Sequence, residues 1–196
     1  MKKKLIALVT AVVAIVPFTG VGTANAAVAG TLAFQCKAEL SAFPTAAGSG
    51  RCRGTVGPAG ITAGVAFGTS TTGPFVITGA GSFEASFTYS EGCVAGEPPL
   101  IGAAQGTATI SGMTAVNNGS PTTASGTISF SWQRVGVTAA IVINGGTISF
   151  GDGASANIGT SAGTAAFVPL LQPNNTCPDG GPLEALVAGT AALAGV

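Results

Sequence analysis

Histidine does not occur anywhere in this chain of 196 residues. Its absence excludes Ser-His-Asp and Cys-His nucleophile systems, and it removes the commonest general base near neutral pH. Histidine-ligated zinc is excluded as well, and no Cys-x-x-Cys pair supplies thiolate ligands in its place. The sequence therefore predicts a protein that is not an enzyme, with no catalytic residues, no metal and no cofactor.

Carboxylates are the remaining catalytic option, because a pair of them suffices for glycoside hydrolysis. Glu84 falls on the polar face of its expected strand, and three other acids fall among turn residues: Glu91, Glu97 and Asp179. Solvated surface acids are therefore the favoured interpretation. Asp152 begins a stretch that resembles a calcium loop, but Ala154 and Ala156 occupy liganding positions and cannot bind the ion, so we predict a turn.

Charged residues are also scarce, at 7% of the chain, and three of the lysines precede an apolar run at its start. Lys2–Lys4, the run Leu5–Val16 and the small-x-small site Ala24–Ala26 are together typical of a secretory signal peptide. The apolar run is too short to cross a bilayer. We predict a signal peptide over residues 1–26, secretion of the rest, and no membrane insertion after cleavage.

The mature chain, residues 27–196, has four basic and seven acidic residues, a net charge of −3. So few scattered charges provide no basic face for nucleic acid and none for an anionic membrane surface. The length fits a single domain with a sizeable core. Glycine is abundant, but a chain this apolar with so small a net charge is expected to fold rather than stay disordered.

Apolar and polar residues alternate along much of the mature chain, which is the pattern of strands with one buried face. In 82–89 one face carries Phe83, Ala85, Phe87 and Tyr89, and in 126–134 one face carries Ile128, Phe130 and Trp132. Glycine and proline interrupt the chain too often for long helices. With turn signals about every 8–12 residues, we predict an all-β fold: roughly ten short antiparallel strands forming a single β-barrel or β-sandwich.

Four local signals refine this prediction. Asn144-Gly145 separates two apolar runs and predicts a tight hairpin, since Asn-Gly suits the type I′ turn. Asn117–Gly119 predicts another connection. Residues 183–196 fit a helix or a strand, and we favour a strand that closes the sheet, because pairing a terminus removes an exposed edge. Val137–Ile143 is apolar on both faces, which indicates a central strand or the contact surface of an oligomer.

The pentapeptide Gly-Thr-Ile-Ser-Phe occurs at 126–130 and at 146–150, and Gly-Thr-Ala-Thr-Ile at 106–110 is a degraded form of it. This period of 20 residues allows stacked coils of a β-solenoid, with an outward threonine ladder like that of an ice-binding face. The turn signals do not repeat with the same period. We therefore favour a simpler interpretation, in which Gly-Thr begins a strand and each period holds two strands of about ten residues.

Four cysteines lie in the mature chain: Cys36, Cys52, Cys93 and Cys177. An even number in an exported protein predicts two disulfides. Three pairings are possible, and we favour Cys36–Cys52 with Cys93–Cys177, because Cys36 and Cys52 lie on neighbouring expected strands with faces that allow an inward bridge.

Trp132 and Arg134 form the candidate ligand site of the sequence. They lie two positions apart on one expected strand and therefore point to the same face. If that face lines a barrel, Trp132 lies inside and Arg134 near the mouth. With Tyr89 they would then bind a ligand that has an apolar body and a polar or anionic tip. The alternative is a core tryptophan followed by a strand-end arginine that reaches solvent or a carboxylate.

The signal peptide, the Gly-Thr-x-x-Phe strands and the ending from Ala165 to Leu193 resemble small secreted Gly/Thr-rich β-proteins of high-GC Gram-positive bacteria. The resemblance covers most of the mature chain and implies a bacterial, secreted β-protein, but it brings no assigned activity and no catalytic residue. The chain departs from calycin-type carriers, because its single tryptophan lies late in the sequence. It also lacks an LPxTG-type ending, so covalent attachment to a cell wall is not expected.

Three functions follow, in order of preference. The first is a secreted, disulfide-stabilised, non-catalytic β domain with a binding or structural role at or outside the cell envelope, where an envelope or extracellular protein is a possible partner. The second is a β-barrel carrier of a small apolar ligand, which requires a cavity that phenylalanine and isoleucine side chains leave unfilled. The third is a carboxylate-based hydrolase, which requires two acids in one cleft and a raised pKa on one of them.

Overall fold

The computed structural model describes residues 29–40, 47–59, 65–69, 73–92, 100–117, 119–135, 138–171 and 183–194. The predicted signal peptide, Cys93 and Cys177 lie outside these residues. Eleven strands occupy the described part: β1 (Ala29–Leu40), β2 (Ala47–Pro58), β3 (Val65–Thr69), β4 (Gly73–Ile77), β5 (Gly81–Gly92), β6 (Leu100–Asn117), β7 (Ser120–Val135), β8 (Thr138–Phe150), β9 (Ser155–Ile158), β10 (Ser161–Leu171) and β11 (Leu183–Ala194).

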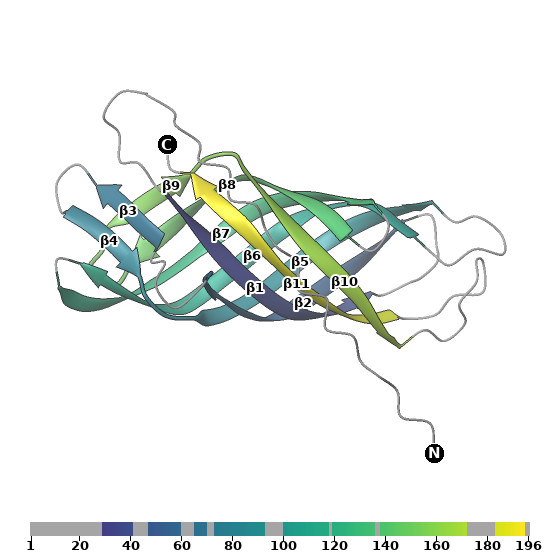
Figure 1. Cartoon of the computed structure of the whole chain (residues 1–196), viewed down its shortest axis with the longest axis horizontal. Coiled ribbons are helices and arrows are strands. Elements are labelled where there is room, and N and C mark those ends of the chain that lie inside the picture. The colour runs from purple at the N-terminus through teal and green to yellow at the C-terminus, as the bar shows by residue number, and fades with distance from the viewer. Residues whose placement is uncertain are drawn as a thin grey trace, which may run out of the picture.

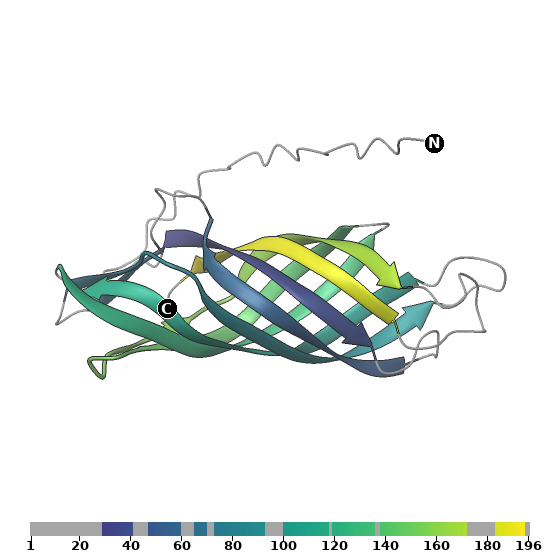
Figure 2. The ribbon, with the colours of Figure 1, turned by 90° about the horizontal axis from the view of Figure 1, so that it is seen from below.

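Eight of these strands close into a barrel. Neighbours in the ring follow the order of the chain, from β1 through β2, β5, β6, β7, β8 and β10 to β11, and all pairs are antiparallel. The last strand returns to the first, since β11 pairs with β1 from Ala194 opposite Ala29 to Leu183 opposite Leu40. Figure 1 shows the tilted strands, and Figure 2 shows β1 beside β11 where the sheet closes. The all-β prediction and the closing strand after residue 183 are confirmed, and the architecture is the barrel.

The eight barrel strands are longer than the sequence indicates, with 11 to 18 residues each. The hairpin predicted at Asn144-Gly145 is wrong, because β8 continues through it. The pair instead forms a β-bulge, where the register with β7 shifts and Gly145 adopts a φ of 146°. A bulge and a type I′ turn both use a positive φ, which glycine adopts at no steric cost, so the same dipeptide serves either.

The connection predicted at Asn117–Gly119 is confirmed. Asn117 pairs with Ser120 at the turn between β6 and β7, and Gly119 has a φ of 83°. The hairpin thus forms at this signal, between β6 and β7, and not at Asn144-Gly145, which lies within β8.

The repeated Gly-Thr segments lie side by side, in the middle of β6 and β7 and over the last five residues of β8. The solenoid and the strand-start interpretation are both wrong. The 20 residues of the period separate a segment on one strand from the equivalent segment on the next, antiparallel strand. The threonines face outward, and each glycine faces inward opposite a large residue of the neighbouring strand. Gly126 lies opposite Ile148, Gly146 opposite Ile128, and Gly106 opposite Phe130. The repeat thus supplies both the large inward side chain and the gap that receives it.

Replacing Gly126 by alanine should lower the free energy of unfolding by about 1–3 kcal/mol. A Cβ at this position would overlap the carbonyl oxygen of Thr147 and lie 2.7 Å from Cδ1 of Ile148. Gly102 is the matched control, because a Cβ there meets nothing closer than the Ser90 carbonyl oxygen at 3.7 Å. Urea unfolding of both variants measures the difference, and equal stability would contradict the packing role of the glycine.

A hairpin outside the ring fills one end of the barrel, which we call the hairpin end. β4 pairs with the end of β6, and β3 pairs with the start of β1. Figure 1 shows the β3–β4 hairpin at the left of the barrel. Phe75 and Ile77 have no exposed surface, and the ring of Phe75 stacks on Phe150 with centroids 4.0 Å apart. We call the opposite end, where β7 finishes after Trp132, the tryptophan end.

The apolar run predicted as a central strand or contact surface is part of the barrel wall. From Thr138 on it forms the first half of β8, with Ile141 and Ile143 buried inside. Ala140 and Val142 face outward, and Val142 is 38% exposed. Contact with a second copy through this face stays a prediction. Within the described part of the chain, no helix has the length and apolar character of a membrane span.

Candidate functional site

The inner face of the barrel is apolar throughout the described residues. Apart from glycine, those that are buried are all hydrophobic, with tyrosine and tryptophan included. The predicted strand faces are confirmed: Ala85, Phe87 and Tyr89 of β5 point inward, and so do Ile128 and Trp132 of β7. Period-2 alternation on a closed sheet turns one face of every strand into a common core.

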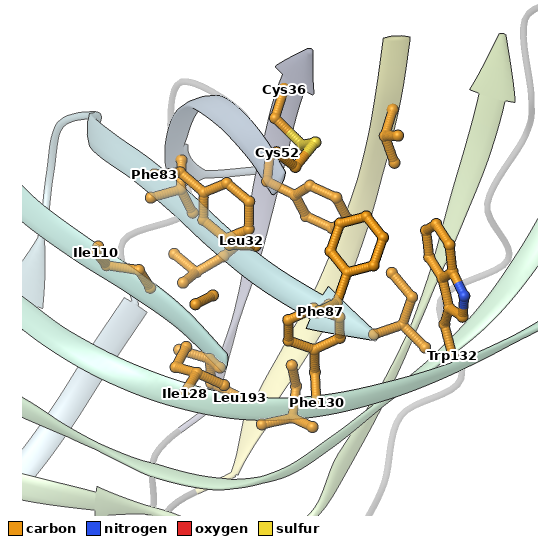
Figure 3. Close-up of a pocket in the computed structure, with 18 residues that line it drawn as sticks. Leu32, Cys36, Cys52, Phe83, Phe87, Ile110, Ile128, Phe130, Trp132 and Leu193 are labelled. Carbon is orange, nitrogen blue, oxygen red and sulfur yellow. A yellow bond between two sulfur atoms is a disulfide. The ribbon is translucent and has the colours of Figure 1, made fainter. Parts of the chain in front are cut away.

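The inward side chains do not fill the barrel. A cavity of about 70 Å³ lies among 18 residues contributed by seven of the eight barrel strands. Figure 3 shows these side chains converging on it from all sides, with Leu32, Phe87, Ile110 and Leu193 among them. An engineered apolar cavity of roughly 150 Å³ stays dry and binds benzene or xenon. The space here is about half as large and has the same kind of lining.

Small side chains on the wall leave this space. Ala85, Ala108 and Ala191 line the cavity from three different strands, together with the larger residues Phe83, Phe87 and Phe130. A larger aliphatic residue at any of the three alanines would occupy the cavity. The carrier hypothesis required such a space, but sequence reasoning did not identify the alanines that leave it. Inward-facing alanine and glycine on otherwise bulky strand faces are the signal that marks them.

The disulfide predicted between Cys36 and Cys52 is confirmed, with a sulfur–sulfur distance of 1.98 Å and Cα atoms 5.4 Å apart. Cys36 lies opposite Gly54 and Cys52 opposite Ala38, so the bridge runs diagonally between β1 and β2. Both cysteines are buried and line the cavity, and Figure 3 shows the two sulfur atoms at its edge. The second predicted bridge, Cys93–Cys177, lies outside the described residues.

The three predicted ligand-site residues gather at the tryptophan end. Trp132 and Tyr89 are buried, and both approach Phe87, with ring centroids 5.6 and 6.5 Å away. Arg134 is half-buried, and its Cζ lies 5.3 Å from the centroid of Phe167, an inward residue of β10. Of the three, Trp132 alone lines the cavity in the described structure. That these side chains bind a ligand stays a prediction.

The indole nitrogen of Trp132 is a buried hydrogen-bond donor that no acceptor among the described residues satisfies. Buried indole N–H groups normally have a partner, because leaving one unpaired costs about 1–3 kcal/mol. Phe87 and Phe167 hold the ring by its apolar surfaces, with Phe167 approaching edge-on at a centroid distance of 6.4 Å. Packing therefore holds this tryptophan, without a hydrogen bond from any residue that the structure describes.

Four acidic side chains lie outside the barrel: Glu39, Glu84, Asp152 and Glu184. Glu84 pairs with Arg53 across β5 and β2 at 3.0 Å, as its place on the polar face predicts. Glu184 accepts from Lys37 Nζ at 2.9 Å, and this hydrogen bond raises the pKa of Lys37 above its ordinary value. Both pairs are exposed on the wall, so they contribute little to stability. Glu91 lies near the end of β5, paired with Ile101, and not in the turn predicted for it, while Glu97 and Asp179 lie outside the described residues.

The turn predicted at Asp152 is confirmed. Its carboxylate accepts hydrogen bonds from the backbone N–H of Ala154 at 3.1 Å and from Asn117 Nδ2 at 2.8 Å. Gly153 follows with a φ of 90°. No group of three or more His, Cys, Asp or Glu side chains that could hold a metal occurs among the described residues.

Comparisons of the chain with protein-family models, with curated proteins and with solved structures find no match in any of the three. The inference of function therefore rests on the geometry of the barrel.

Proposed function

We propose that this chain is a secreted, non-catalytic β-barrel that binds a small apolar molecule inside the barrel. The observation that carries the proposal is the apolar cavity of about 70 Å³ within the core. Export is supported by the basic start and apolar run of the sequence and by the disulfide, which forms and persists in oxidising compartments.

An unfilled cavity is costly in a protein with a purely structural role. At about 24 cal/mol per Å³, a volume of about 70 Å³ lowers stability by roughly 1.7 kcal/mol. Three of the lining residues are alanines, so a single larger side chain would remove this cost. A bound molecule removes it too, by restoring the missing contacts along the wall. The retained space therefore supports a binding role.

The single tryptophan of the chain lines the cavity and gives a direct test. Xenon under pressure should quench the fluorescence of Trp132 in a saturable manner, because a heavy atom in the cavity contacts the indole. Benzene serves as a second, larger probe. Xenon binding measured in the purified, oxidised protein gives the affinity of the empty site.

Replacing Ala108 by leucine should abolish the binding and stabilise the protein. Ala108 is a buried lining residue of β6, and the added carbons occupy the cavity. We expect xenon affinity to fall by about tenfold or more while the midpoint of urea unfolding rises. Ala166→Leu, on the exposed outer face of β10, is the matched control and should leave xenon binding unchanged.

Two results would count against the proposal. If neither xenon nor benzene changes the fluorescence of Trp132, the cavity does not accept an apolar molecule. If Ala108→Leu and Ala166→Leu weaken xenon binding equally, the effect does not come from the cavity. A structural role at the envelope would then be the better account of the barrel.

A further inference from the structure

Packed side chains close the cavity at both ends. At the hairpin end Phe75 and Ile77 have no exposed surface, and neither is among the lining residues. At the tryptophan end the ring of Trp132 lies between Phe87 and Phe167, with ring centroids 5.6 and 6.4 Å away, and all three residues are buried. These side chains confine a bound molecule to the cavity itself.

Among the described residues, no polar atom lines the cavity. The two sulfur atoms at its edge belong to the Cys36–Cys52 disulfide and carry no S–H to donate (Figure 3). The indole nitrogen of Trp132 lies on the side of the ring turned away from the cavity. A hydroxyl, carbonyl or charged group placed here would lose its hydrogen bonds to water and gain none. The site therefore selects against every molecule that carries such a group.

The volume of the cavity limits the size of the molecule. An engineered cavity of roughly 150 Å³ binds benzene, which has six carbons. In proportion, a cavity of about 70 Å³ holds roughly three atoms other than hydrogen. Xenon, a single large atom, falls within this limit, whereas benzene exceeds it.

So small a molecule binds weakly, however well it fits. At the highest binding energy per atom that small ligands reach, three atoms give a dissociation constant of about 0.5 mM. A scarce metabolite would leave such a site almost empty. Occupancy requires a ligand dissolved at a comparable concentration, and gases in equilibrium with the surrounding medium reach that range.

We infer that the ligand of this cavity is a dissolved apolar gas. This inference rests on the proposed function and specifies its ligand class. Dioxygen and hydrocarbons of up to three carbons share the required chemistry, because they are small enough and carry no strong hydrogen-bonding group. The apolar wall accepts both, so the experiment has to distinguish them.

The first measurement varies polarity at constant size, and then size at constant polarity. Xenon, propane, ethanol and benzene are added to the oxidised protein, and binding is followed by the methyl ¹H–¹³C resonances of the lining residues Ala85, Ala108 and Ala191. We expect xenon and propane to shift these resonances saturably, with dissociation constants of about 0.5 mM or higher. Ethanol has as many heavy atoms as propane but carries a hydroxyl, so it should bind at least about tenfold more weakly. Benzene should not bind.

Paramagnetic broadening then distinguishes dioxygen from a hydrocarbon. Dioxygen in the cavity should broaden the methyl resonances of Ala108 and Ala191 more than those of Ala140 and Ala166, which are exposed on the outer wall. Dinitrogen at the same pressure is the diamagnetic control. Tighter binding of dioxygen than of propane assigns the ligand to dioxygen, and the reverse order assigns it to a hydrocarbon.

Replacing Ile128 by alanine should make benzene a ligand. Ile128 is buried and lines the cavity, and removing three of its carbons should about double the space. Ile77→Ala is the matched control, because it makes the same truncation at a buried residue of the hairpin end that does not line the cavity. We expect benzene to shift the alanine methyl resonances in Ile128→Ala alone. The wild-type comparison of propane, ethanol and benzene tests the same limits without any substitution, in case a variant folds poorly.

The two proposals fail in different ways. If xenon and propane bind, but benzene or ethanol binds the wild-type barrel as tightly as propane, the inferred ligand class is wrong and the binding site stands. If Ile128→Ala folds and still excludes benzene, or if Ile77→Ala accepts it equally, the size of this cavity does not select the ligand and the inference is likewise overturned. If xenon, propane and benzene all fail to bind, the proposed function itself fails.

Discussion

Replacing Phe75 by alanine should lower the free energy of unfolding by about 3–5 kcal/mol. The side chain has no exposed surface, and its ring stacks on Phe150 at a centroid distance of 4.0 Å. Its neighbour Ile77 is equally buried, and strand pairing on both sides of β4 keeps the wall from collapsing onto the space that the ring would leave. Domains are stable by only about 5–15 kcal/mol, so urea unfolding should show a large loss.

Phe83→Ala is the matched control for this prediction. Phe83 also points inward, but it lines the cavity and is only partly buried, with its ring stacked on Phe34 at 5.6 Å. Its ring already lacks neighbours on the cavity side, so its removal breaks fewer contacts and should cost less. Equal losses for the two variants would show that the hairpin end is no better packed than the cavity wall.

The inward faces of the strands were predictable because alternation has a period of two, whatever the architecture. Phe83 to Tyr89 and Ile128 to Trp132 alternate strictly with serine, threonine and glutamate, so their common face follows from the sequence alone. The diagonal bridge between Cys36 and Cys52 was predictable for the same reason. That Tyr89 and Trp132 share one end of the barrel depends on the register of β5 with β6 and of β6 with β7, which alternation does not determine.

The glycines led to wrong predictions of where the strands end. In most proteins a glycine inside an apolar run indicates a turn, and this expectation yielded short strands and a hairpin at Asn144-Gly145. Here Gly106, Gly126 and Gly146 lie within long strands, because large side chains from neighbouring strands need the space. A glycine can end a strand, or it can lie within a strand and leave space for a large side chain. Which of the two applies depends on the residue that faces the glycine, and that residue lies on another strand.

The carrier hypothesis required a cavity, but its place and its lining could not be predicted, because they depend on volume and not on pattern. An alanine and an isoleucine are equally good inward residues for the alternation, yet they differ by several carbons in the space they fill. Ala85 and Ala108 are direct partners on the neighbouring strands β5 and β6, but Ala191 lies on β11, and only closure of the barrel brings it to the same space. Trp132, at the edge of that space, is the one predicted ligand-site residue that lines it.

Replacing Cys36 and Cys52 together by alanine should lower the free energy of unfolding by about 3 kcal/mol, the loss expected for a cross-link that closes a loop of about 15 residues. The two cysteines are 16 residues apart in the chain, and both are buried in the barrel wall. The bridge acts mainly on the unfolded chain, which it keeps from expanding. The double variant should therefore also show a steeper dependence of stability on urea, since more surface becomes exposed on unfolding.

The steeper urea dependence separates loss of the cross-link from loss of packing, because both cysteines also contact the cavity. Val56→Ala is the control: Val56 lies on β2 near Cys52, is buried and lines the same cavity, but it bridges nothing. That variant should lower the stability and leave the urea dependence unchanged. If the double cysteine variant behaves in the same way, the bridge contributes only its volume to the wall, and the barrel needs no cross-link to restrain its unfolded state.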